Sequence, residues 1–224
     1  QIHTANYFAQ MVRGWGAPPH RLHIVNCGID ADRFSPTARP TWRPRCCKFM
    51  LLSARRLVKK NGLEYLIRAM PEIRKNWGAH LAIAGDGPER RGLEDLAAEF
   101  GVKEHVSFLG LLRNEEIPGL LSACDVAIVP SLIEAPGLFL LEAMAAARAV
   151  VATGVGSIPE VLDGENGVIV RPRQPKEIAE AVGRLLSNSE ERVRIGLKAR
   201  RTVESDYTIE AMAGHILDIY RSIL

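Results

Sequence analysis

The sequence predicts an α/β fold in which one parallel sheet lies between two layers of helices, a three-layer Rossmann-like arrangement. Short apolar runs alternate with helical patterns along almost the whole chain, which is typical of βαβ units. The apolar runs are continuous, as expected for parallel strands that are buried on both faces. Hydrophobic residues make up 47% of the 224 residues, enough for a sizeable core and too many for a disordered chain.

The individual elements follow in chain order. Strands are expected at residues 22–26, 49–54, 80–84, 106–109, 126–129, 150–152 and 167–170. Helices are expected at residues 63–76, 88–100, 115–123, 138–147, 158–162, 175–187, 190–203 and 209–224. Ligands of parallel sheets bind beyond the carboxyl ends of the strands. The loops after Ala54, Ala84, Leu109 and Val129 are therefore where a site is expected.

Two segments look peripheral to this sheet. Residues 2–15 have a helical pattern, and the break Gly16-Ala17-Pro18-Pro19 after them is a credible linker. Residues 35–45 contain three prolines and predict an irregular excursion.

Composition excludes several classes of protein. Formal net charge is +3, from 29 basic and 26 acidic residues, which is too balanced to indicate a nucleic-acid partner. No apolar run is long enough for a membrane span, and no signal peptide opens the chain. The four cysteines form no C-x-x-C pair, which favours a reducing cytoplasmic location over a structural zinc site or a disulfide framework. The chain starts with Gln1 rather than Met, so we expect a fragment or a processed piece.

The most informative pair of residues is Glu134 and Glu142, which stand eight positions apart in an apolar stretch. Carboxylates are rarely placed there without partners, because an unpaired buried charge is costly. The expected helix beside them offers free N–H groups and a positive dipole end, which suit a phosphate. The pattern indicates a ligand with a sugar or ribose and a phosphate.

The surrounding motifs resemble the donor-site signature of the retaining GT-B glycosyltransferases of family 4, the glycosyl transferases group 1. The matching segments are Pro130-Ser131, Glu134, Ala135-Pro136-Gly137, Glu142-Ala143-Met144-Ala145, Ala149-Val150-Val151-Ala152 and Val155-Gly156-Ser157-Ile158-Pro159-Glu160. An upstream segment, Ile24 to Asp30 followed by Arg33-Phe34, is similar to another family motif. The long, ordered match is more specific than two glutamates at a fixed spacing.

The resemblance implies roles for the residues around the two glutamates. Glu142 would bind ribose hydroxyls, and Glu134 would contact and orient the donor sugar. Backbone N–H groups around Gly137 and Leu138 would meet the phosphates or the sugar. Pro136 departs from the family pattern and has no N–H to donate.

The loop from Ser53 to Gly62 resembles the phosphate-binding loop of the family. Arg56 matches the family arginine, and Asn61 stands where the family has a lysine. Lys60, or Lys59, would then supply the second cation that stabilises a leaving diphosphate. Asn61 could instead cap the following helix, with Glu64 three residues on.

Two further turns resemble parts of the family's donor cleft. After Gly110, backbone groups of Leu111 and Leu112 would face the nucleobase; the alternative is that these two leucines are plain core. The turn Gly85-Asp86-Gly87-Pro88 lacks the third glycine of a dinucleotide fingerprint. It is expected to be mainly structural, with Pro88 at the first position of a helix.

The resemblance implies three parts. Residues 1–16 would be a remnant helix of a missing N-terminal acceptor domain, residues 17–206 the donor-binding C-terminal half of a GT-B fold, and residues 207–224 a crossover helix. Its substrates would be a UDP-sugar or GDP-mannose and a saccharide or lipid-linked acceptor, with no resident cofactor or metal. The chain alone would be inactive, and the full-length enzyme could associate peripherally with a membrane.

Other functions remain open. A non-catalytic sugar-nucleotide-binding module and a nucleotide-sugar epimerase are compatible with the same architecture. A nicotinamide-dependent dehydrogenase is the weakest alternative, because the glycine fingerprint is incomplete.

Overall fold

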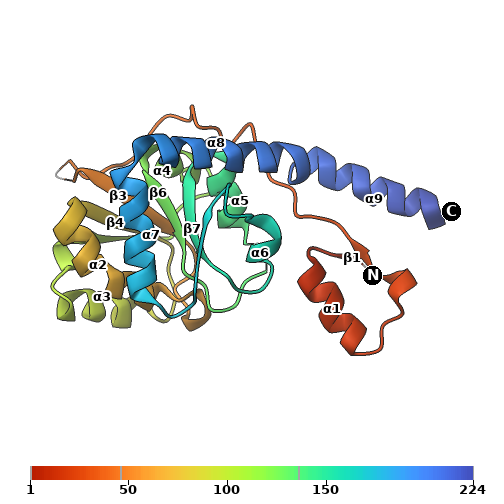
Figure 1. Ribbon diagram of the computed structural model, residues 1–224, viewed down its shortest axis with the longest axis horizontal. Coiled ribbons are helices and arrows are strands. Elements are labelled where there is room, and N and C mark those ends of the chain that lie inside the picture. Colours follow the sequence, from red (N-terminus) through yellow and green to blue (C-terminus); the bar gives the residue numbers. More distant parts are fainter. Residues whose placement is uncertain (1, 46, 136, 224) are drawn as a thin grey trace.

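The computed structural model describes residues 2–45, 47–135 and 137–223. Its centre is a sheet of six parallel strands in the order β5-β4-β3-β6-β7-β8 (Figure 1). The strands are β3 (Phe49–Ala54), β4 (Ala79–Ala84), β5 (Val106–Gly110), β6 (Val126–Val129), β7 (Ala149–Thr153) and β8 (Val168–Val170). The order reverses between β3 and β6, so their loops diverge at the edge where such sheets bind ligands.

Helices cover both faces of the sheet. One face is covered by α2 (Leu63–Trp77), α3 (Arg90–Glu99) and α7 (Pro175–Ser187). The other is covered by α4 (Ile117–Ala123), α5 (Leu138–Ala145), α6 (Ile158–Val161) and α8 (Ser189–Asp206). The predicted three-layer arrangement is therefore confirmed.

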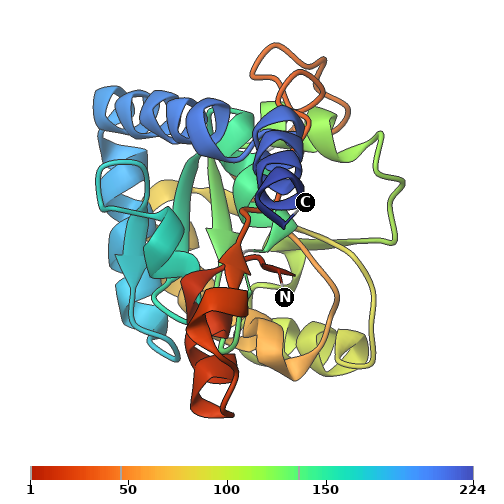
Figure 2. The same cartoon turned by 90° about the vertical axis from the view of Figure 1, so that its right-hand side faces the viewer.

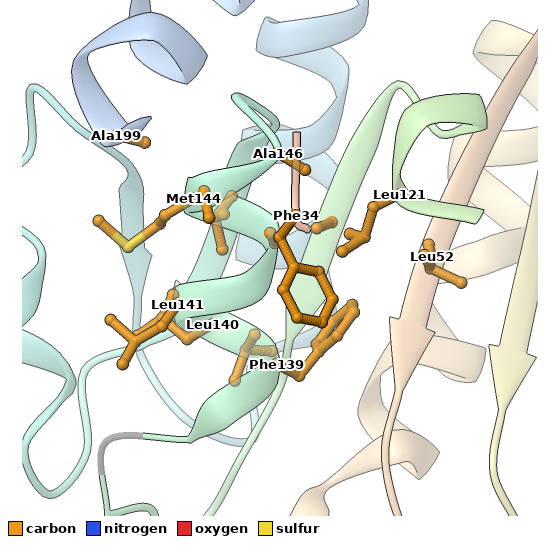
Figure 3. Close-up of a cluster of buried hydrophobic side chains, with 14 of the residues drawn as sticks. Phe34, Leu52, Leu121, Phe139, Leu140, Leu141, Met144, Ala146 and Ala199 are labelled. Carbon is orange, nitrogen blue, oxygen red and sulfur yellow. The ribbon is translucent and has the colours of Figure 1, made fainter. Parts of the chain in front are cut away.

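The alternation of side chains along each strand divides the core in two. Met50 and Leu52 of β3 pack under α4 and α5, whereas Leu51 between them faces α2 and α7. Helix α5 buries its own side chains Phe139, Leu140, Leu141 and Met144 in this core (Figure 3). This burial explains why the sequence of the helix is almost entirely apolar. A helix that is buried along most of its length is a rigid support for a side chain that lines the surface.

The N-terminal segment differs from the prediction. The helix expected at residues 2–15 is shorter, because Ile2–His3 form a strand (β1) and α1 covers only Asn6–Gly14. Extended backbone at Ala5 separates the two. The prediction of a strand of the main sheet at residues 22–26 is also wrong. Strand β2 covers only His23–Ile24, and it pairs with β1 outside that sheet. Seen from the side in Figure 2, this segment lies in front of the main sheet.

Other boundaries moved slightly. Helix α3 begins at Arg90, so Pro88 lies in the turn before the helix and not at its first position. No helix or strand occurs in residues 35–45, as predicted, and a 3-10 turn (Pro19–Arg21) follows the expected linker. Helix α9 (Ile209–Ile223) continues from α8 and extends away from the sheet (Figure 1). No helix in the described part of the chain is both long and apolar enough to cross a membrane.

Candidate functional site

Glycines draw the loops at the carboxyl edge of the sheet together. A Cβ on Gly85 would stand 2.1 Å from the carbonyl oxygen of Arg55, and one on Gly87 would stand 2.3 Å from that of Leu57. A Cβ on Gly62 would stand 2.0 Å from the carbonyl oxygen of Pro130. Because only glycine permits such approaches, the loops after β3, β4 and β6 are joined into one surface. The mainly structural role expected for the Gly85-Asp86-Gly87 turn agrees with these contacts.

Two hollows open on this surface, and both are lined by Ala54, Arg55 and Arg56. The first hollow has a volume of about 610 Å³ and lies over β3, β4 and the loop after β5. Its other lining residues are Ala84, Gly85, Asp86, Gly87, Leu111, Leu112, Asn114, Ile117 and Glu142. The predicted location, beyond Ala54, Ala84, Leu109 and Val129, is where these hollows occur.

Glu142 is the only charged residue of α5, and it lines the first hollow. Burial raises the pKa of Glu142 to about 7, and the positive charge of Arg33 lowers it. The apolar packing of α5 thus places a partly desolvated carboxyl group where it can exchange hydrogen bonds with hydroxyl groups of a ligand. Arg33 belongs to the segment after β2 and was not among the predicted site residues.

The second hollow, of about 510 Å³, lies between the loop after β3 and the start of α5. Its other lining residues are Val58, Lys60, Asn61, Val129, Glu134, Gly137, Leu138, Phe139 and Leu140. The first N–H groups of a helix have no intrahelical acceptors, and Gly137 at the start of α5 offers no side-chain cap. This end of α5 therefore suits an anionic group.

Glu134, which lines this hollow, is held by the side chains of Arg55 and Ser131. Arg55 donates from Nη2 to Oε2 of Glu134, and it donates from Nη1 to the Ser131 hydroxyl at 2.8 Å. The Ser131 hydroxyl in turn donates to the same Oε2 at 2.5 Å. Burial lowers the pKa of the Arg55 guanidinium, and the charge of Glu134 opposes that change. The three side chains form one closed hydrogen-bonded group that is largely buried.

The predicted cations lie on the rim. Arg56 and Lys60 are exposed, and both line the second hollow, where phosphate oxygens could reach them. Asn61 is buried and donates from its amide to the carbonyl of Arg56 at 2.6 Å. The alternative that Asn61 caps α2 is wrong, because Gly62, with φ of +64°, occupies the cap position and no side chain caps the helix. Asn61 instead closes the loop that carries Arg56 and Lys60.

The structure also decides between the two interpretations of the turn after β5. Gly110 ends the strand with φ of +72°, and its carbonyl accepts a hydrogen bond from Gly85 at 2.7 Å. Leu111 is 80% exposed, so the reading of Leu111 as plain core is wrong, while Leu112 packs partly against the core. Both leucines line the first hollow.

The structure brings most of the predicted site residues together at these two hollows. Arg56, Leu111, Leu112 and Glu142 line the first, and Arg56, Lys60, Asn61, Glu134, Gly137 and Leu138 line the second. Gly110 supports the first from the end of β5 without lining it. Pro136, also predicted to bind the donor, lies outside the described residues.

Arg55 and Ser131, which both contact Glu134, were not among the predicted site residues. The only signal in the sequence was that Arg55 stands next to the predicted Arg56, just after the strand. Asn114, which lines the first hollow, ends the segment Phe108 to Asn114 that resembles the family's base-binding turn, but it was not among the predicted site residues. Within residues 2–45, 47–135 and 137–223, no group of three or more His, Cys, Asp or Glu residues could hold a metal ion.

Comparisons with known proteins show the family and the fold of this chain. The family model of glycosyl transferases group 1 matches residues 37–202. An uncharacterized glycosyltransferase of Methanocaldococcus jannaschii is 39% identical over 173 residues, which cover 77% of this chain and 44% of the relative. A GDP-mannose-dependent alpha-(1-6)-phosphatidylinositol monomannoside mannosyltransferase of Mycobacterium tuberculosis is 32% identical over 220 residues, covering 91% of this chain and 57% of the relative.

The solved structures include a sucrose-phosphate synthase from Thermosynechococcus elongatus, which matches with a TM-score of 0.87 and 26% identity over 99% of this chain and 57% of that chain. The chain spans about half the length of these relatives. The predicted fold class, a Rossmann-like parallel sheet of the GT-B type, is confirmed. The family model matches most of this chain, and the chain has the fold of a GT-B C-terminal domain. This chain therefore belongs to the glycosyl transferases group 1 family.

Proposed function

We propose that this chain is the donor-binding half of a retaining glycosyltransferase of family 4, and that it binds a nucleotide-diphosphate sugar across the two hollows. The observation that carries the proposal is the pair of adjoining hollows, one ending at Glu142 and the other at Glu134 and the start of α5. Ala54, Arg55 and Arg56 lie between them, where a diphosphate would join a nucleoside to a sugar.

The nucleoside would occupy the first hollow. Glu142 would accept hydrogen bonds from ribose hydroxyls, and the exposed turn at Leu111 and Leu112 would cover the base. Buried carboxylates are strong acceptors when they are ionised, so a pKa near 7 makes this contact sensitive to pH.

The diphosphate and the sugar would occupy the second hollow. Arg56, Lys60 and the first N–H groups of α5 would bind the phosphates and stabilise the diphosphate as it leaves. Glu134 would orient the sugar, and the acceptor would attack from the face that the diphosphate leaves, so that the configuration is retained. No step in this scheme requires a metal, and we propose metal-independent transfer of a hexosyl group.

The relatives support the choice of donor class. One is named as a GDP-mannose-dependent mannosyltransferase, and we propose that GDP-mannose or a UDP-sugar is the donor here too. The acceptor would be a saccharide or a lipid-linked saccharide. We also propose a cytoplasmic location, because the four cysteines form no C-x-x-C pair and suggest no disulfide framework.

The rest of the active site would belong to an N-terminal acceptor domain. Helix α9 extends beyond the sheet with Leu217 and Tyr220 exposed, which supports its proposed role as a crossover helix. Residues 1–16 would then be the last part of that acceptor domain. The chain alone would bind donor without transferring sugar, and the full-length enzyme would reach lipid-linked acceptors by peripheral association with a membrane.

Calorimetric titration of this chain with UDP, GDP and ADP, with EDTA and then with Mg²⁺, tests the proposal. One nucleotide should bind equally well in both buffers, and Glu142→Ala and Arg56→Ala should each weaken it by about tenfold or more. Glu99→Ala and Arg91→Ala are matched controls, because both side chains are exposed on α3 away from the hollows.

The results separate this proposal from its alternatives. Binding of no nucleotide, or binding that the two site variants leave unchanged, would reject a donor site in these hollows. Release of an epimerised sugar from a nucleotide sugar without any acceptor would favour an epimerase. Transfer by the full-length protein would exclude a purely binding module.

A further inference from the structure

Arg55 occupies a place in the site that its neighbour Arg56 does not. Arg56 is exposed on the rim, whereas the side chain of Arg55 is only 8% exposed and turns inward at the end of β3. Both hollows share it as a lining residue. Two adjacent arginines thus present one cation to solvent and one, held by hydrogen bonds, to the interior.

Arg55 fixes one carboxylate oxygen of Glu134 and makes no hydrogen bond to the other. Oε2 accepts from both Arg55 and the Ser131 hydroxyl. Oε1 lies beside Gly137, where an added Cβ would stand 2.9 Å from it. Among the described residues, no hydrogen bond to Oε1 is formed. Glu134 and Gly137 both line the second hollow, so Oε1 is the oxygen that a ligand can use.

This arrangement contributes little to the stability of the fold. The side chain of Glu134 is 12% exposed, and Nε of Arg55 is buried without a hydrogen-bond partner in the described part of the chain. Buried ion pairs often contribute little net stability, and a buried N–H without an acceptor reduces it further. A carboxylate that only needed solvation would be placed more cheaply at the surface. The geometry therefore indicates that the orientation of Glu134 has been favoured over stability.

We propose that Arg55 is a positioning residue that, with Ser131, locks Oε2 of Glu134 so that Oε1 is presented to a hydroxyl of the donor sugar. This inference rests on the proposed function, and it assigns sugar recognition to a fixed pair of side chains from the loops after β3 and β6. Arg55 acts through Glu134 on the sugar part of the donor. The nucleoside and diphosphate contacts belong to other residues.

The test compares each nucleotide with its sugar derivative on this same chain. Affinities for UDP and UDP-glucose, and for GDP and GDP-mannose, are measured by calorimetry, and the ratio of the two Kd values in each pair reports on the sugar alone. Arg55→Met should weaken the binding of the nucleotide sugar relative to the free nucleotide by about tenfold. The Kd of the free nucleotide should change by no more than about twofold. Arg55→Lys keeps the charge but cannot donate to Glu134 and Ser131 from two guanidinium nitrogens. Its Kd ratio should therefore lie between those of the unaltered chain and Arg55→Met.

Two other variants keep the test decisive. Arg55→Met leaves Glu134 buried without its cation and could fail to fold, so Arg55→Met/Glu134→Gln is measured beside it; the pair should show the same loss of the sugar contribution. Arg43→Met is the matched control, because Arg43 pairs with Asp125 at the opposite, amino end of β6. Its ratio should equal that of the unaltered chain.

The outcomes distinguish this inference from the function beneath it. If the unaltered chain binds none of the four probes, the proposed function itself fails. If nucleotides bind but the ratio is unchanged in the Arg55 variants, or nucleotide and nucleotide sugar weaken equally, the positioning role is overturned and the donor site stands.

Discussion

Gly156 lies directly against the backbone carbonyl of Glu134. A Cβ at residue 156 would stand 1.8 Å from that oxygen, and Gly156 itself has φ of +56°. The N–H of Ser157 donates to the same carbonyl at 3.4 Å. The loops after β6 and β7 are thereby joined at the residue whose carboxylate faces the second hollow, so the position of Glu134 depends on a glycine from a different loop.

Gly156→Ala is expected to lower the free energy of unfolding by at least about 2–3 kcal/mol, because contact with a backbone oxygen adds to the strain of the left-handed conformation. The control is Gly164→Ala, where φ is +85° and nothing lies within 4 Å of the added Cβ. It should cost only about 1–2 kcal/mol. Urea unfolding measures both, and equal costs would mean that the contact with Glu134 relaxes freely.

Glu142 should make stability depend on pH. Its pKa rises from 4.5 to about 7 on folding, so its contribution is fully present below pH 4.5 and is lost as pH rises through 7. Glu142→Gln removes this loss. The variant should be more stable than the unaltered chain by about 1–3 kcal/mol at pH 8, with little difference near pH 4.5. Denaturant midpoints at the two values check it, and parallel pH profiles for both proteins would contradict it.

Glu160 should anchor the N-terminal helix. Its carboxylate accepts from the N–H groups of Asn6 at 2.8 Å and of Tyr7 at 2.7 Å, and no local side chain caps α1. Removing these contacts in Glu160→Ala should cost about 1–2 kcal/mol locally. Hydrogen exchange of residues 6–14 should then accelerate by about 5–30-fold, because local opening becomes that much easier.

The control for this effect is Glu180→Ala, an exposed position on α7. Exchange in the strands of the sheet should stay unchanged in both variants. Unaltered exchange of α1 in Glu160→Ala would mean that other contacts hold the helix in place.

The central sheet could be predicted because its signals are local. Strands β3 and β6 and helix α7 have the expected boundaries, since strands buried on both faces give continuous apolar runs and α7 begins at a proline. The strand at His23–Ile24 could not be assigned correctly, because its pairing with β1 joins residues that are far apart in sequence. Register between distant short segments leaves no periodic pattern to detect.

The site could be predicted as a set of residues but not as a set of contacts. Glu134 and Glu142 were recognisable as charges in apolar sequence, yet nothing there indicated that Arg55 rather than Arg56 turns inward. That choice depends on the path of the loop after β3, which is set by its approach to Gly85 and Gly87. For the same reason Asn61 could not be known to bond to a carbonyl in its own loop.

Arg33 should tune the affinity of the first hollow. Its positive charge lowers the pKa of Glu142, although its exposure to solvent weakens the effect. If ionised Glu142 binds the ribose, Arg33→Met should raise the pKa of Glu142 by about half a unit and weaken nucleotide binding about two- to threefold at pH 7. At pH 8.5 the carboxyl group is ionised in both proteins, so the difference should disappear. Arg39→Met, also exposed in the segment before β3, is the control. A loss of affinity that is the same at both pH values would mean that Arg33 contacts the nucleotide itself, and that its influence does not pass through Glu142.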